Sequence, residues 1–130
     1  MLVFLKKYEV FLFTVFRVFV GLLFMQHGAQ KLFGWFSDKA GAELFSLMGI
    51  AGVIEFFGGL LIAVGLFTRL VALIGGLEML VAYFKAHFPS GLVPIMNKGE
   101  LALLYFACFL VLLIYGAKKF SLDALWFKKE

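Results

Sequence analysis

Four stretches of this chain are long and apolar enough to cross a lipid bilayer, and this pattern restricts the fold more than any other feature. A helix that crosses the hydrocarbon core needs about 20 mostly apolar residues. The four stretches are Val10–Ala29, Leu47–Leu66, Leu70–Phe88 and Leu101–Ala117. The sequence therefore predicts an all-α membrane protein, a four-transmembrane-helix bundle.

The composition supports a membrane protein and argues against a soluble one. Of the 130 residues, 64% are hydrophobic and only 15% are charged. A soluble domain has roughly 25% charged residues, so a soluble form of this chain would have too few polar side chains to cover its surface. A chain of this length is expected to form one transmembrane domain over residues 1–130.

The segments between the predicted spans differ in length and character. The connection Gln30–Ser46 mixes aromatic and charged residues, so it is expected to lie in the membrane interface. The connection Phe67–Arg69 is so short that the second and third spans must form a tight hairpin. Pro89–Gly99 has the proline and glycine of a turn. After the last span, Ser121 can cap a short amphipathic helix, Leu122–Lys129.

Four spans place both termini on one side of the membrane, and the basic residues indicate which side. Seven lysines and arginines fall on the side of the termini and four on the other side. The first group comprises Lys6, Lys7, Arg69, Lys118, Lys119, Lys128 and Lys129, and the second Lys31, Lys39, Lys85 and Lys98. The positive-inside bias therefore predicts cytoplasmic termini. The paired lysines beside apolar runs suit anionic lipid headgroups better than nucleic acid.

Three ionisable residues, Arg17, Glu55 and Glu78, lie inside the predicted spans. Facing lipid, each charge would cost at least about 2.5 kcal/mol, so all three are expected to face the bundle interior. Arg17 is expected near the bilayer centre, opposite Glu55 or Glu78. One arginine cannot neutralise two carboxylates, and the unpaired acid is expected to exchange a proton. A purely structural role, holding the bundle together, would equally explain Arg17.

The first span carries a stripe of polar and small residues along one helix face. Its members recur at intervals of four and three: Arg17, Gly21, Phe24, Gly28 and Lys31. His27 lies one turn before Lys31, and Glu100 opens the fourth span. The sequence thus predicts two tiers of candidate site residues. Arg17, Glu55 and Glu78 form the central tier, and His27, Lys31 and Glu100 form the outer tier.

The sequence contains no motif for a metal, flavin or nucleotide. Cys108 is the single cysteine, which excludes an internal disulfide and a thiolate cluster. His27 and His87 lie on different spans and lack the HxxxH or ExxH spacing of a helical metal site. No glycine-rich loop follows a strand. We therefore expect no metal site.

Several linked motifs resemble those of a known family. They are Arg17 through His27-Gly28 to Lys31-Leu32, then Glu55–Leu61 running to Gly65–Arg69, then Asn97–Ala102, and finally Phe120–Asp123. Together they resemble the DoxX family of small bacterial and archaeal membrane proteins over nearly the whole chain. Lys98 departs from the pattern, because the family often has a glycine at this position.

The resemblance implies a four-helix protein of the bacterial or archaeal cytoplasmic membrane. It also implies a relationship to a subunit of a thiosulfate:quinone oxidoreductase, and to proteins of quinone detoxification or oxidative-stress protection. The function expected is therefore a quinone-interacting membrane subunit of an oxidoreductase system. In this interpretation Glu55, Glu78 and Arg17 are catalytic, while His27, Lys31 and Glu100 bind a non-covalent quinone.

Nothing in the chain supplies a redox cofactor of its own, so a quinone or a redox partner protein must carry the electrons. Two further functions fit the same residues. A small proton-coupled transporter would also use two central carboxylates. A scaffold would recruit a soluble redox enzyme to the membrane through its basic cytoplasmic ends. A homo-oligomer is compatible with all three functions.

Overall fold

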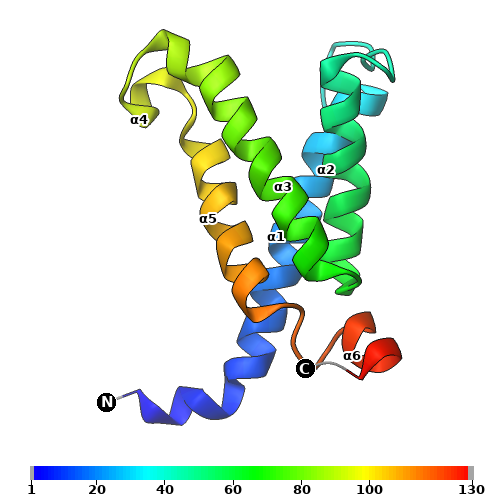
Figure 1. Ribbon diagram of the computed structural model, residues 1–130, viewed down its shortest axis with the longest axis vertical. Helices are drawn as coiled ribbons and strands as arrows, with labels where there is room; N and C mark the ends of the chain where they lie inside the picture. Colours follow the sequence, from blue (N-terminus) through cyan, green and yellow to red (C-terminus); the bar gives the residue numbers. More distant parts are fainter. Residues whose placement is uncertain (1, 129–130) are drawn as a thin grey trace.

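The computed structural model describes residues 2–128, which form helices and no strand (Figure 1). Four long helices run antiparallel: α1 (Glu9–Phe33), α2 (Leu47–Val64), α3 (Thr68–Ala82) and α5 (Glu100–Tyr115). We call the end of the molecule that holds both termini the lower end, and the opposite end, with the 34–46 connection, the upper end (Figure 1). The all-α prediction is confirmed.

The predicted spans agree with the helices to within a few residues at most ends. Helical segments covering Val3–Phe33, Leu47–Val64 and Thr68–Ser90 are long and apolar enough to cross a membrane. The fourth, α5, is an apolar helix of 16 residues. The first helix exceeds its prediction at both ends, because Glu9 and the residues after Ala29 continue the helical pattern.

The four helices associate as two pairs, with α1 packed along α2 and α3 packed along α5. Glycines bring α1 and α2 unusually close. A Cβ atom built on Gly21 would lie 2.5 Å from the backbone nitrogen of Ala63 and 2.6 Å from the carbonyl oxygen of Gly59. Such distances leave room only for hydrogen, so the two backbones are in contact. Towards the upper end the two pairs diverge (Figure 1).

A small apolar core joins the two pairs. Phe24, Ile62, Phe109 and Leu112 are almost completely buried, and the Phe24 and Phe109 rings meet edge to face at 4.8 Å. The outer helix faces instead carry exposed leucine, isoleucine and phenylalanine side chains, such as Phe19 with 62% of its surface accessible. An apolar exterior of this kind suits lipid and not water.

Short helices complete the lower end. A 3-10 helix, Val3–Tyr8, precedes α1. The predicted C-terminal helix is present as α6 (Leu122–Phe127), and the Ser121 hydroxyl caps it by accepting a hydrogen bond from the Ala124 backbone N–H. Its predicted last residue, Lys129, lies outside the described residues.

The third connection is built around one buried amide at the upper end. A π-helical turn, Tyr83–His87, extends α3, and a 3-10 turn, Phe88–Ser90, leads to α4 (Pro94–Asn97). The Asn97 side chain donates to the Tyr83 hydroxyl at 3.2 Å and accepts from the Gly99 N–H at 2.8 Å. This network sets where α5 begins.

Candidate functional site

A pocket of about 250 Å³ lies between the two helix pairs, towards the upper end. All four long helices and the third connection contribute to its wall. The residues that line it are Phe24, His27, Lys31, Glu55, Met79, Ala82, His87, Lys98, Leu101, Ala102 and Tyr105. Most of the wall is apolar or aromatic, and its ionisable groups come from several helices. This combination is typical of small-molecule sites.

An ion pair between Lys31 of α1 and Glu55 of α2 forms the polar side of the pocket. The Lys31 Nζ atom lies 2.8 Å from Oε1 and 2.7 Å from Oε2 of Glu55, so it bonds to both carboxylate oxygens. Only 4% of the Glu55 side chain is accessible, compared with 25% of the Lys31 side chain. The pair therefore presents the ammonium group to the pocket while the carboxylate stays buried.

The Lys31–Glu55 contact joins two residues that the sequence analysis assigned to different tiers. Lys31 starts at the upper end of α1, but side chains on a helix lean towards its N-terminus. For α1 that direction leads into the bundle, so the long lysine side chain reaches the middle of α2. Gly28 allows α1 to approach α2 closely enough for this contact. A Cβ atom at position 28 would collide with the backbone of Phe56, the residue after Glu55.

His27 and two aromatic residues form the adjoining wall. The His27 ring meets the Tyr105 ring edge to face at 5.7 Å, and Tyr105 lies 5.3 Å from Phe24, measured between ring centroids. Tyr105 is buried apart from 8% of its surface. The structure thus brings together His27, Lys31 and Glu55 of the six predicted site residues.

The other three predicted site residues lie elsewhere. Glu78, on α3, has both carboxyl oxygens buried, but it precedes the pocket residue Met79 and does not itself line the pocket. Glu100 is exposed at the first turn of α5 and stays outside the pocket wall. Arg17 is far below, towards the lower end.

The predicted pairing of Arg17 with Glu55 or Glu78 is wrong. The guanidinium group donates instead to three backbone carbonyl groups, those of Ile62 and Ala63 at 2.7 Å each and that of Phe120 at 2.6 Å. Carbonyl groups in the last turn of a helix lack intrahelical partners, and a cation there also complements the helix dipole. Arg17 therefore caps α2 and fastens the segment after α5 to it, and it is not at the centre of the bundle.

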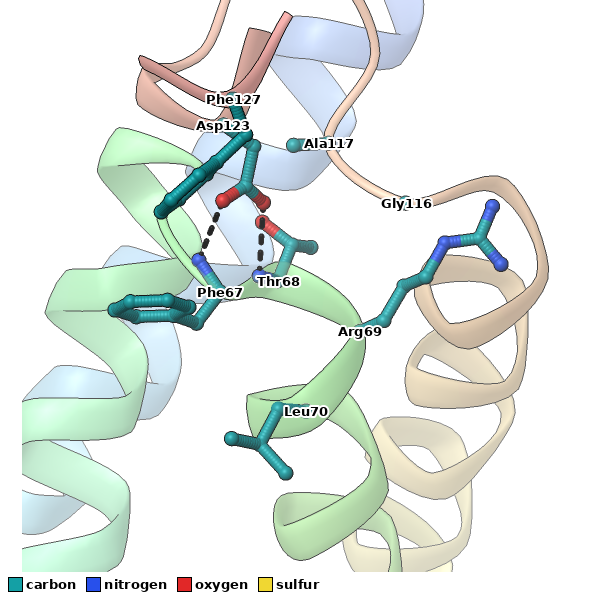
Figure 2. A pocket seen from close by; sticks show the side chains of 8 residues that line it. All are labelled: Phe67, Thr68, Arg69, Leu70, Gly116, Ala117, Asp123 and Phe127. Atoms are coloured by element: carbon teal, nitrogen blue, oxygen red, sulfur yellow. Dashed lines mark hydrogen bonds between the residues drawn. The ribbon is translucent and has the colours of Figure 1, made fainter. Parts of the chain in front are cut away.

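A second pocket, of about 290 Å³, lies at the lower end between the α2–α3 turn and α6 (Figure 2). Asp123 of α6 lines this pocket, and both of its carboxylate oxygens accept hydrogen bonds there. One carboxylate oxygen accepts the N–H of Phe67 at 2.7 Å and the other accepts the N–H of Thr68 at 3.0 Å. These two N–H groups lie at the start of α3. Asp123 therefore caps the N-terminus of α3, although it lies far from this helix in the sequence. Its polar groups are thereby used for structure.

Sequence reasoning did not single out Tyr105 or Met79 in the pocket, nor the capping role of Asp123. Tyr105 follows Leu101 by one helical turn, so these two residues share a face of α5. A tyrosine within an apolar span was a usable signal, because its hydroxyl needs a polar partner. Met79 had no such signal, because methionine fits any apolar position.

Comparison with known proteins agrees with these features. The family model described as DoxX matches residues 12–88, which include most of α1, all of α2 and α3, and the Lys31–Glu55 pair. The chain belongs to the DoxX family. As a DoxX protein it is a membrane protein, in agreement with the apolar outer faces of its helices.

Three relatives resemble this DoxX chain over most of their length. An uncharacterized protein of Haemophilus influenzae is 38% identical over 96% of this chain and 98% of its own. Inner membrane protein YqjF of Escherichia coli is 33% identical over 96% of this chain and 99% of its own. A Bacillus subtilis protein named "Putative oxidoreductase CatD" is 29% identical over 86% of this chain and 84% of its own. No solved structure matches the chain.

Proposed function

We propose that this DoxX protein is a quinone-interacting membrane subunit of an oxidoreductase system, and that the upper pocket holds the quinone ring. The observation that carries the proposal is the Lys31–Glu55 ion pair beside the apolar and aromatic part of the pocket wall. Well-packed apolar residues often stabilise a protein as well as a buried ion pair does. An ion pair at the edge of a pocket is better explained by a ligand than by stability.

The residues of the pocket suit a quinone. Its volume of about 250 Å³ is just below the range of roughly 300 to 1,000 Å³ typical for drug-sized ligands. A single ring fits, while a long isoprenoid tail would remain in the lipid. Phe24 and Tyr105 offer aromatic surface to the ring. Lys31 Nζ, the His27 ring and the Tyr105 hydroxyl are donors for its two oxygens.

Each polar residue has a role that follows from its chemistry. Reduction of a quinone places negative charge on its oxygens, and the Lys31 ammonium group stabilises such charge by a charge-assisted hydrogen bond. Glu55 holds the Lys31 ammonium group in place through both carboxylate oxygens. His27 is placed to donate a hydrogen bond or a proton from the adjacent wall.

The electrons come from a redox partner protein in this proposal. The chain contains one cysteine and no dinucleotide fingerprint, so it has no group of its own that could hand over two electrons. The partner is soluble or membrane-bound and reduces the quinone at the upper pocket. The relative from Bacillus subtilis named as an oxidoreductase supports this class of reaction. The inner membrane protein of Escherichia coli supports a cytoplasmic-membrane location.

Quinone binding by the purified protein tests the proposal. The protein is extracted in a mild detergent, and retained quinone is identified by mass spectrometry. Affinity for a short-tailed quinone is then measured by equilibrium binding for the wild type, Lys31→Met and Glu55→Gln. A lost hydrogen bond to a charged group is worth about 1.5 to 3 kcal/mol, so each substitution should weaken binding about tenfold to a hundredfold.

Lys85→Met is the matched control. Lys85 is exposed on the π-helical turn and does not line the pocket, so this variant loses a lysine without altering the site. Its affinity should stay within about twofold of the wild type. Equal affinity in all three variants, each checked for folding by its melting temperature, would contradict the proposal.

The two other functions give different results in the same preparation. A proton-coupled transporter would show substrate-dependent proton flux in liposomes and no retained quinone. A scaffold would retain a soluble partner in fixed stoichiometry and bind no quinone. Neither is favoured by a specific contact in the pocket.

A further inference from the structure

Glu78 of α3 is a buried acid with no role in the hydrogen-bond network. Among the described residues, neither of its carboxyl oxygens has a hydrogen-bond partner, and both are sealed from solvent. The neighbouring acid Glu55 differs, because both of its oxygens accept bonds from Lys31. Lys31, the cation whose charge acts on Glu78, is therefore already bonded to the other carboxylate.

An ionised Glu78 would be costly in this position. A carboxylate without a partner in an apolar medium costs far more than a neutral acid does. Lys31 attracts a negative charge on Glu78, whereas Glu55 repels it. The cluster is electrically neutral when Lys31 and Glu55 are ionised and Glu78 is not.

Glu78 is also close to the pocket along its helix. It directly precedes Met79 and lies one turn before Ala82, and both of these residues line the pocket. Residues four apart share a helix face, so the Glu78 carboxyl group lies on the same side of α3 as Ala82.

We propose that Glu78 is a neutral carboxylic acid in the resting protein and the proton store of the upper pocket. The neutral state of Glu78 does not depend on the proposed function. Its role as the proton store rests on the proposed function. When the redox partner has reduced the ligand, a ligand oxygen carries negative charge. The O–H bond of Glu78 then breaks, an O–H bond to that oxygen forms, and the electron pair remains on the Glu78 carboxylate until a proton from solvent restores the acid.

Infrared spectroscopy tests the resting state directly, because a neutral carboxylic acid has a carbonyl stretching band that a carboxylate lacks. The full chain is measured at neutral pH in a detergent without ester groups, as wild type, Glu78→Gln and Lys85→Met. The band should be present in the wild type, absent from Glu78→Gln and retained in Lys85→Met, because Lys85 is exposed and does not line the pocket. A wild type without the band, or a band that survives in Glu78→Gln, would overturn the proposal.

Melting temperatures provide a second measurement that does not depend on the spectrum. Glutamine has the shape of a neutral glutamic acid, so Glu78→Gln should fold and melt within about a degree or two of the wild type. Glu55→Gln leaves Lys31 without its partner and should melt several degrees lower. A Glu78→Gln variant that fails to fold would show that the protein needs a carboxylate there, and the inference would be wrong.

Quinone binding separates this inference from the proposed function. Glu78→Gln should bind quinone like the wild type, because Glu78 does not line the pocket, but should lose at least tenfold in partner-driven quinone reduction. If no variant binds quinone while the infrared band behaves as expected, the proposed function fails and the neutral acid stands. If binding is normal and the band is missing, only the neutral acid fails.

Discussion

At the scale of single residues, two cations on one face of α1 serve opposite ends of the bundle. Lys31 follows Arg17 by 14 positions, which is about 21 Å along a helix. Both side chains lean towards the helix N-terminus. For Lys31 this direction leads to Glu55 in the bundle interior, and for Arg17 it leads to the carbonyl groups that end α2.

Double-mutant cycles should separate these two roles. Lys31→Met and Glu55→Gln remove partners of one ion pair, so their effects on the free energy of unfolding should be coupled by about 0.5 to 3 kcal/mol. Arg17→Met and Glu55→Gln act at distant sites and should be additive within about 0.5 kcal/mol. Reversible unfolding in detergent measures both cycles. Strong coupling between Arg17 and Glu55 would restore the pairing that the structure excludes.

Arg17 itself should matter for stability and not for the pocket. Arg17→Met leaves three backbone carbonyl groups without their charged donor, and each hydrogen bond to a charged group is worth about 1.5 to 3 kcal/mol. We expect a loss of about 3 kcal/mol or more in the free energy of unfolding. The remaining folded protein should bind quinone with unchanged affinity at low temperature.

At the scale of elements, glycines of α1 and α2 such as Gly59 face the backbone of the neighbouring helix, whereas Gly75 and Gly76 of α3 face side chains of α5. A Cβ atom on Gly59 would collide with the backbone of Met25 and lie 2.5 Å from the Gly21 carbonyl oxygen. On α3, a Cβ atom on Gly76 would lie 3.6 Å from Cβ of Phe109, an ordinary contact. The two helix pairs should therefore respond differently to the same substitution.

Gly59→Ala should cost about 3 kcal/mol, the upper end of the range for overpacking, because both colliding groups are backbone and cannot rotate away. Gly76→Ala is the matched control, and alanine should stabilise α3 by up to about 1 kcal/mol through its helix propensity. Melting temperatures in one detergent compare the two variants. Equal destabilisation would mean that α3 and α5 pack as tightly as α1 and α2.

The cap that Asp123 places on α3 couples the C-terminal segment to the α2–α3 turn. Asp123→Ala removes both acceptors, and loss of an N-terminal cap costs about 0.5 to 2 kcal/mol. Amide hydrogen exchange at Phe67 and Thr68 should become faster in this variant. Asp38→Ala, in the exposed upper connection, should leave both amides as protected as in the wild type.

At the scale of the whole molecule, the structure shows which loops and termini lie at each end of the helical bundle (Figure 1). The basic residues predict which end faces the cytoplasm. In a Cys108→Ala background, a membrane-impermeant thiol reagent applied to intact cells should label Asp38→Cys and Ser90→Cys at the upper end. It should miss Lys119→Cys at the lower end until the membrane is opened. The reverse pattern would place the termini outside.

Most of the architecture could be predicted because hydropathy and turn residues act locally. They located the long helices, the tight turn between the second and third spans, and the cap at Ser121. The turn itself lies at residues 65–67, two residues before the predicted Phe67–Arg69, because α3 begins at Thr68. The pairing of charges could not be predicted in the same way. It depends on the direction in which a long side chain leans and on close contacts between helices, such as the contact made by Gly28. Residue spacing along a single helix contains no information on these contacts.

The length of α5 has a consequence for the membrane around the protein. Its 16 residues rise about 24 Å, whereas the hydrocarbon core is about 30 Å thick. A bilayer meets a short apolar helix by becoming thinner beside it. Leu101 and Ala102 of α5 belong to the pocket wall, so thinning at this end of α5 would bring the headgroup layer closer to the pocket. Protons from water would then have a shorter path to the site than an undisturbed leaflet allows.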